Sequence, residues 1–276
     1  MVDHKCREFI KWISHGDPLF SLYSDASKEG WGAVRKGDKT GSRWTVTSES
    51  NLHINELETL AAFFALKAFC PSMTNCHINI CIDNTTAVSY INVMGITHSL
   101  QCNKIAREIW TWCIQRKIWV TAIPLPSKGN VDADRESRTF NDNTEWSLKE
   151  NIFHSIAETY GMPYIDLLAS RINRKVSRYV SWRPDPEAQF VDAFSCSWSH
   201  EHFYAFPPFS LTLRCLKKIE IEEGEGIIIV PVWPTQPWYP KVMSFLVDTP
   251  RLLPVTRETL YLLSKPSQPH PMEGKL

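Results

Sequence analysis

Short apolar runs separated by glycines open the patterned part of the chain. The run from Leu19 to Ser24 breaks at Asp25, and a second run follows around Trp31 to Val34. A third run, Trp44 to Thr47, is rich in residue types that favour strands. Three short strands in succession predict a three-stranded meander.

The period of the pattern changes in the next segment. Apolar residues recur at helical spacing over 56–70 and leave Glu58 beside the apolar stripe, with Asn55 as the expected N-cap. An alternating strand follows from His77 to Ile82 and stops at Asp83, and a short helix is expected directly after it. Strands and helices therefore alternate in this part of the chain.

Two further helices and one strand complete the first pattern. Ser99 can cap a helix that runs to about Lys117, Trp119 to Ile123 predicts a strand, and a last helix begins at about Asp132. Because helices connect the later strands, these strands are expected to pair in parallel. Residues 19–140 are thus predicted to form an α/β domain.

A polar stretch at 141–144 marks a predicted boundary. After it, a helical pattern leads to a strand at Tyr164 to Ala169, and further strands are expected at Tyr204 to Phe206 and Gly226 to Val232. These elements predict a second α/β domain over 145–253. The flanking parts are an N-terminal segment, residues 1–18, and a Pro-rich tail, residues 254–276, which is expected to be disordered from about Ser264.

Composition narrows the classes of protein that fit. The chain of 276 residues has 30 basic and 30 acidic residues, so any nucleic-acid binding must depend on a local basic face. The eight cysteines form no CxxC pair, so a zinc site is not expected and free thiols are expected in the core. No apolar leader and no membrane-spanning stretch is apparent. We therefore expect an intracellular location, in the nucleus or cytoplasm, and no membrane partner.

Four acidic residues lie where predicted elements meet: Asp25, Glu58, Asp83 and Asp134. Ligands of open α/β sheets gather at strand ends, and hard carboxylate oxygens are what Mg²⁺ requires. Four such groups suit two Mg²⁺ ions about 4 Å apart, one activating water at a phosphate and the other stabilising the leaving oxygen. Mn²⁺ can substitute for Mg²⁺ in this prediction.

Four motifs carry a resemblance to a known family. They are SDASKEGWGAV at 24–34, ELETLAAFFALKAF at 56–69, ICIDNTTAV at 80–88 and KGNVDADRESR at 128–138. Their order and spacing resemble the ribonuclease H domain of retroelements, in particular DIRS-type retrotransposons, over about residues 19–139. The resemblance implies a mixed five-stranded sheet with flanking helices. It also implies metal-dependent cleavage of the RNA strand of RNA–DNA hybrids, with a reverse transcriptase polymerase domain as a partner.

The same resemblance implies a role for each carboxylate. Asp25 matches the first-strand aspartate, Glu58 the helix glutamate, and Asp83 the aspartate that ends the fourth strand. Asp134 matches the last aspartate of the family, which stands in an Ala-Asp-x-x-Ser-Arg setting. The family's mobile histidine has no counterpart before Asp134, since residues 121–140 contain no His. A decayed nucleic-acid-binding protein that keeps the fold is the alternative function.

Each assignment has a structural alternative. Asp25 can cap a turn, Asp83 can be the N-cap of the next helix, and Glu58 can complete a capping box with Asn55. The choice of Glu58 over Glu56 follows the family register. Asp132 replaces Asp134 if the register of the loop shifts by two residues.

Binding to a hybrid is expected to use backbone and 2′-hydroxyl contacts. The first candidate is Asn84, which follows Asp83 directly. The cationic candidates are Lys28, Arg35 and Lys128, with Lys36, Lys104 and Arg107 as further ones.

The second half resembles the domain that follows ribonuclease H in DIRS-type polyproteins, and it is similar to adenine-N6 methyltransferases. The resemblance matches Asp166 to the cofactor-binding aspartate that follows a strand. Phe206, Pro207 and Pro208 match a Pro-Pro-aromatic motif, but Phe206 replaces the amide or carboxylate that would hold the target amine. No glycine-rich turn follows Asp166. The domain is therefore expected to be degenerate and not to use S-adenosylmethionine.

Overall fold

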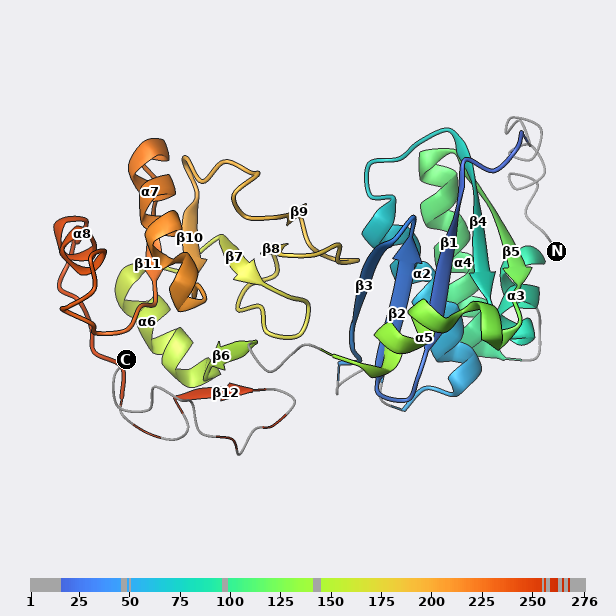
Figure 1. The fold of residues 1–276 in the computed structure, drawn as a ribbon, viewed down its shortest axis with the longest axis horizontal. Helices are drawn as coiled ribbons and strands as arrows, with labels where there is room; N and C mark the ends of the chain where they lie inside the picture. The colour runs from blue at the N-terminus through green and yellow to red at the C-terminus, as the bar shows by residue number, and fades with distance from the viewer. Residues whose placement is uncertain are drawn as a thin grey trace. The chain divides into compact units, whose positions relative to one another are not determined.

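The computed structural model describes residues 16–45, 49, 51–95, 99–140, 145–254, 256, 259–262, 265 and 268. The chain divides into two compact units, shown in Figure 1. The first ends at Phe140 and takes in Pro184–Glu187, and the second comprises the rest of the chain. Each unit has its own sheet and its own apolar core. Among the described residues, no helix combines the length and apolarity needed to span a bilayer.

The first unit is built on a mixed five-stranded sheet in the order β3-β2-β1-β4-β5. Its strands are β1 Phe20–Ala26, β2 Gly30–Arg35, β3 Asp38–Arg43, β4 Cys76–Ile82 and β5 Ile118–Pro124. The first three pair antiparallel as a meander, whereas β4 pairs in parallel with both β1 and β5. The predicted α/β class and the mixed five-stranded sheet are confirmed.

Helices cover both faces of this sheet. They are α2 Ile54–Phe69, α3 Thr85–Asn92, α4 Leu100–Arg116 and α5 Val131–Arg138, with a 3-10 turn at Ser127–Gly129. Trp31 of β2 packs edge-on against Phe64 of α2, at 5.3 Å between ring centroids. The next residue, Gly32, lies under α5, where an added Cβ would stand 2.3 Å from the carbonyl oxygen of Ala133. Because successive strand residues face opposite sides, α2 and α5 lie on opposite faces.

Two local predictions in this unit are wrong. The third strand is β3, Asp38–Arg43, and the predicted Trp44–Thr47 lies beyond it, with residues 46 and 47 outside the described residues. The reason is that β3 is buried by backbone contact with α5, so its sequence carries no apolar signal: an added Cβ on Gly41 would stand 2.8 Å from the carbonyl oxygen of Glu136.

The second wrong prediction concerns the start of α2. The N-cap is His53, not Asn55: the His53 ring accepts the Asn55 N–H, and Glu56 accepts the His53 N–H at 2.9 Å. Asn55 instead accepts a side-chain hydrogen bond from Asn84 at 2.9 Å.

The second unit is built on an all-parallel five-stranded sheet in the order β11-β10-β7-β8-β9. These strands are β7 Ile165–Ala169, β8 Tyr179–Ser181, β9 Phe190–Val191, β10 His202–Ala205 and β11 Glu225–Ile228. The helices are α6 Glu150–Tyr160, α7 Thr212–Glu222 and α8 Tyr239–Ser244, with a 3-10 turn at Phe209–Leu211. A separate antiparallel pair joins β6 Trp146–Leu148 to β12 Leu260–Leu262.

The structure corrects one prediction in this unit. The strand predicted to reach Val232 ends at Ile228, since Pro231 has no N–H to extend the ladder. At the start of the Pro-rich tail, Leu260 and Leu262 are buried and form β12 with β6. The disorder expected from about Ser264 stays a prediction. Most of the residues after 262, and residues 1–15 of the N-terminal segment, lie outside the described residues.

Candidate metal centre and nucleic-acid interface

The central strands bring two of the predicted acids to one edge of the first sheet. Asp25 is the last residue but one of β1 and is 3% exposed. Its parallel neighbour β4 ends at Ile82, so Asp83 follows at the same edge. Carboxyl ends of parallel strands meet in this way by geometry alone. Asn84, not Asp83, caps α3 through its side chain, accepting the Ala87 N–H at 2.9 Å.

Helix α2 supplies the third acid from its first turns. The Glu56 carboxylate accepts the His53 N–H at 2.9 Å and lies 3.2 Å from the Ser99 hydroxyl, so Glu56 belongs to the cap of the helix. Glu58, two residues later, is 4% exposed and points to the acids of the sheet. The capping role considered for Glu58 is thus performed by Glu56.

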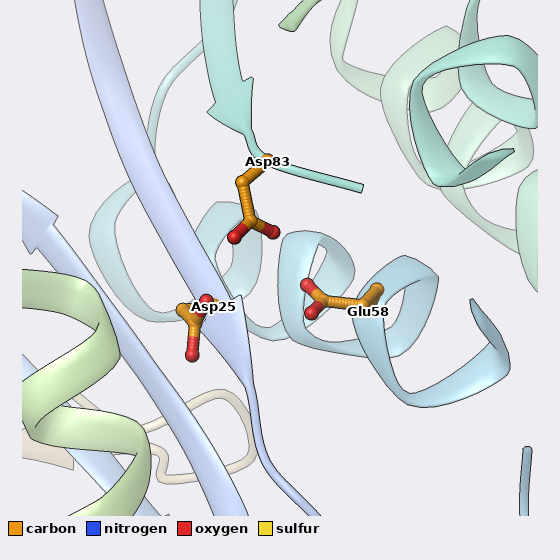
Figure 2. A group of neighbouring side chains, drawn as sticks. All are labelled: Asp25, Glu58 and Asp83. Carbon is orange, nitrogen blue, oxygen red and sulfur yellow. The ribbon is translucent and has the colours of Figure 1, made fainter. Parts of the chain in front are cut away.

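One oxygen each of Asp25, Glu58 and Asp83 lies within 4.8 Å of the others, and Figure 2 shows the three carboxylates facing a common space. Burial, and then the charges of Asp25 and Asp83, raise the pKa of Glu58 to about 9. Burial, and then the charges of Asp83 and Asp134, raise the pKa of Asp25 to about 6, although a hydrogen bond from Ser137 opposes the shift. The buried Glu58 Oε2 has no hydrogen-bond partner.

This donor set fits a hard divalent cation. A positive ion would stabilise the three carboxylates, which repel one another, and would give the buried Glu58 Oε2 a partner. Carboxylate oxygen is the ligand that Mg²⁺ prefers. The cluster could therefore hold a metal ion.

The fourth predicted acid lies near this cluster and outside the group of three. Asp134 is in the first turn of α5, and its charge contributes to the raised pKa of Asp25. Its side chain is half-exposed and accepts a hydrogen bond from Arg138 Nε at 2.7 Å. The alternative ligand, Asp132, pairs with Lys39 at 2.7 Å, and that contact lowers its pKa.

Helix α5 contributes Ser137, the serine of the Ala-Asp-x-x-Ser-Arg motif, to which the sequence assigned no role. The buried Ser137 hydroxyl donates to Asp25 Oδ2 at 2.6 Å, and the Ser27 hydroxyl donates to the Ser137 carbonyl oxygen at 2.6 Å. The signal available in the sequence was the position of this serine, three residues after Asp134 on a helix. Ser137 therefore fixes one oxygen of Asp25 against α5.

Comparison with known proteins identifies the class of the first unit. Residues 17–112 match the model of the RNase H-like domain found in reverse transcriptase. These residues form an RNase H-like domain. The matched range holds Asp25, Glu58 and Asp83, whereas Asp134 lies after it.

Three solved structures that are similar to part of the chain are ribonucleases H by name. RNase H1 from the halophilic archaeon Halobacterium salinarum NRC-1 is 18% identical over 42% of this chain and 92% of its own, with a TM-score of 0.35. LC11-RNase H1 in complex with RNA/DNA hybrid is 14% identical over 42% and 92%, with a TM-score of 0.34. The N-terminal RNase H domain of rv2228c from Mycobacterium tuberculosis is 15% identical over 42% and 90%, with a TM-score of 0.32. No curated protein matches the chain.

The residues proposed to contact a hybrid differ in how the RNase H-like unit uses them. Both polar atoms of the Asn84 side chain are engaged, by the Ala87 N–H and by Asn55. Arg35 donates to the Phe69 carbonyl oxygen at 2.8 Å and stacks over the ring of Phe20, so it supports the fold. The other cationic candidates are exposed, and of them Lys28 donates to the Leu52 carbonyl oxygen: Lys28, Lys36, Lys104, Arg107 and Lys128.

In the second unit, Asp166 lies inside a strand and not after one. It is the second residue of β7, is 2% exposed, and accepts backbone N–H groups of Lys175 at 3.0 Å and Leu168 at 3.5 Å. Burial raises its pKa to about 7, while these hydrogen bonds oppose the shift. Asp166 and Phe206 border one cavity of about 10 Å³. Beside Phe206, Pro207 is buried and Pro208 exposed.

Proposed function

We propose that the first unit is a metal-dependent endonuclease that cleaves the RNA strand of RNA–DNA hybrids. One observation carries the proposal: Asp25, Glu58 and Asp83 converge from β1, α2 and the end of β4, and Glu58 Oε2 is buried without a partner. The match of residues 17–112 to the RNase H-like domain found in reverse transcriptase supports the class of reaction.

Each residue of the proposed site would have a distinct role. Asp25, Glu58 and Asp83 would hold the cation, with Asp134 as the nearest further carboxylate. Bound divalent ions supply an activated water and stabilise the charge that develops on the phosphate. Ser137 holds Asp25 in position, because its hydroxyl fixes one carboxylate oxygen. Arg138, paired with Asp134, places a positive charge close enough to the acids that they raise its pKa.

We also propose that the unit descends from a retroelement and works beside a reverse transcriptase polymerase domain, in the nucleus or cytoplasm. The description of the matching family as a domain of reverse transcriptase supports this origin. Co-purification of the chain with such a polymerase would test the partnership.

Incubation of the full chain with an end-labelled RNA–DNA hybrid tests the activity. With Mg²⁺ or Mn²⁺ we expect RNA fragments that carry 5′-phosphate and 3′-hydroxyl ends, and no cleavage in chelator. Asp25→Asn should be inactive, whereas Asp38→Asn, an exposed residue of β3, should be active. An intact hybrid at enzyme excess with both metals would reject the proposal, and cleavage of duplex DNA instead would assign a different nuclease class.

A second candidate function is hybrid binding without turnover. One observation favours it: Asp134 accepts a hydrogen bond from Arg138 and lies outside the group of three acids. Calorimetry distinguishes the two functions: binding unchanged by Asp25→Asn, together with no cleavage by the parent chain, supports a binding protein.

For the second unit we propose a degenerate methyltransferase-like domain that serves a structural or nucleic-acid-binding role. Its parallel sheet reverses direction of winding at β7, as doubly wound α/β folds do at their ligand crevice. Asp166, however, is satisfied by backbone N–H groups inside the sheet.

A further inference from the structure

A groove of about 890 Å³ runs along one edge of the second unit's sheet. The strand at this edge is β11, the last in the sheet order. All four of its residues, Glu225–Ile228, line the groove. Successive side chains of a strand face opposite sides of the sheet, so a groove that meets four in a row follows the open edge.

The edge of β11 offers backbone hydrogen-bonding groups to this groove. The Ile229 N–H donates to the carbonyl oxygen of Ala205 in β10 at 2.9 Å. The backbone groups of Ile229, and of Ile227 and Glu225 at alternate positions before it, therefore face β10. In a parallel ladder the alternate residues, Gly226 and Ile228, then direct their N–H and C=O groups outward. Gly226 is exposed, and it has no side chain to cover them. An edge of this kind is a template for another strand.

Two contacts within the unit fix segments that line the groove. On one side, the Tyr160 hydroxyl at the end of α6 donates to the Thr249 carbonyl oxygen at 2.8 Å. On the other side, Lys241 of α8 forms an ion pair with Glu220 of α7. The space between them has an apolar lining, which includes Leu216, Ile219, Val242 and Phe245.

Acidic side chains border this apolar space. Glu223, Glu225 and Asp248 line the groove and are exposed, and Glu220 is the acid already paired with Lys241. Among the residues that line it, His202 is the only basic one. This surface attracts cations and repels phosphate.

We propose that the groove binds an extended peptide of a partner protein rich in Lys or Arg, which adds as a strand to the edge of β11. Backbone hydrogen bonds to Gly226 and Ile228 supply general affinity, and alternate side chains reach the apolar pocket and the acids. The recognised chemistry is thus a basic segment that alternates with apolar residues. This surface is independent of the acidic centre of the RNase H-like unit, so either proposal can fail alone.

Fluorescence anisotropy of the full chain with a labelled peptide of alternating lysine and valine tests the proposal. We expect saturable binding that weakens as salt is raised, and no binding of the peptide with glutamate in place of lysine. Replacing Glu223 and Glu225 together by Gln should weaken binding by about fivefold, which corresponds to about 1 kcal/mol for the two exposed ion pairs together. Glu158→Gln, an exposed acid of α6 outside the groove, is the matched control.

The strand geometry has its own test. A peptide N-methylated at the alternate residues that face β11 cannot donate to the edge, so it should bind at least tenfold more weakly. Changes in backbone amide chemical shift on binding should concentrate at β11. Equal binding of the methylated peptide, equal binding to the Gln variant, or a preference of this groove for single-stranded nucleic acid over the lysine peptide would overturn the proposal.

Discussion

Each unit places a buried aspartate on the central strand of a five-stranded sheet, Asp25 on β1 and Asp166 on β7. Burial is the largest cause of the raised pKa of both carboxyl groups. Their surroundings differ. Glu58 and Asp83 face Asp25, and a buried oxygen of Glu58 lacks a partner, whereas Asp166 accepts two backbone N–H groups.

The position along the strand accounts for this difference. Asp25 stands near the carboxyl end of β1, where the end of a parallel neighbour and the first turns of α2 bring more acids. Asp166 stands near the amino end of β7, where the chain folds back and Lys175 supplies its N–H. The first carboxylate thus belongs to a cluster of acids that could hold a cation, whereas the second accepts hydrogen bonds from the protein itself.

The largest expected effect comes from removing one acid of the first group. Asp83→Asn should lower magnesium-dependent cleavage by roughly a thousandfold or more, because bound metal contributes several kcal/mol to the transition state and about 1.4 kcal/mol is tenfold. Without metal the variant should be at least as stable as the parent, since one of several repelling charges is gone. A melting curve run beside the hybrid assay separates the two effects. Loss of activity together with unfolding would assign Asp83 a structural role.

Asp166 should instead control stability as a function of pH. The native carboxyl has a pKa of about 7, above the value of 3.8 expected in the unfolded chain, so the native state binds the additional proton between these values. Stability should therefore fall as pH rises from about 4 to 7, by roughly 4 kcal/mol for a shift of about three units at 1.36 kcal/mol each. Calorimetric unfolding between pH 4 and 8 measures the slope.

Asp166→Asn mimics the protonated carboxyl and should reduce this pH dependence, while the exposed Asp248→Asn should not. Asp25 and Glu58, whose pKa values are also raised, account for the slope that remains. The same slope in parent and Asp166→Asn would show that Asp166 is ionised at little cost.

Sequence periodicity predicted the elements that carry an apolar stripe. The ends of α4 and its Ser99 cap were confirmed, because one face of that helix is buried and its first N–H groups require a polar cap. Strand β3 was misplaced, since Gly41 and its neighbours are buried by backbone approach and not by apolar side chains.

The periodicity of the sequence could not predict contacts between residues that lie far apart in the chain. Strand β12 exists because Leu260 and Leu262 meet β6, more than a hundred residues earlier, and no local signal specifies that pairing. The residue types of the acidic centre and their order predicted Asp25, Glu58 and Asp83 as neighbours. That Glu56 caps α2 and that Ser137 bonds Asp25 across 112 residues follow only from the three-dimensional arrangement.

Ser137→Ala should sharpen the contrast between the two units by loosening Asp25 without removing a charge. The lost hydrogen bond joins a hydroxyl to a carboxylate, and partners that orient a metal ligand typically contribute ten- to a hundredfold to affinity or activity. We expect the half-saturating magnesium concentration to rise by about tenfold. Ser89→Ala, an exposed helix serine that bonds the Thr85 carbonyl, is the matched control. An unchanged magnesium dependence with a lowered melting temperature would make Ser137 structural only.

The smallest signal is expected from the second unit when it is offered S-adenosylmethionine. Asp166 already accepts the N–H groups of Lys175 and Leu168, and the cavity that it shares with Phe206 is about 10 Å³, room for about one water molecule. The phenyl ring of Phe206 cannot accept a hydrogen bond from an adenine amine, and an unpaired buried amine costs about 1–3 kcal/mol. Isotopically labelled methyl groups should therefore not enter adenine-containing DNA. Incorporation that disappears in Asp166→Ala would show that this carboxylate takes part in binding or transfer and does not only accept hydrogen bonds within the sheet.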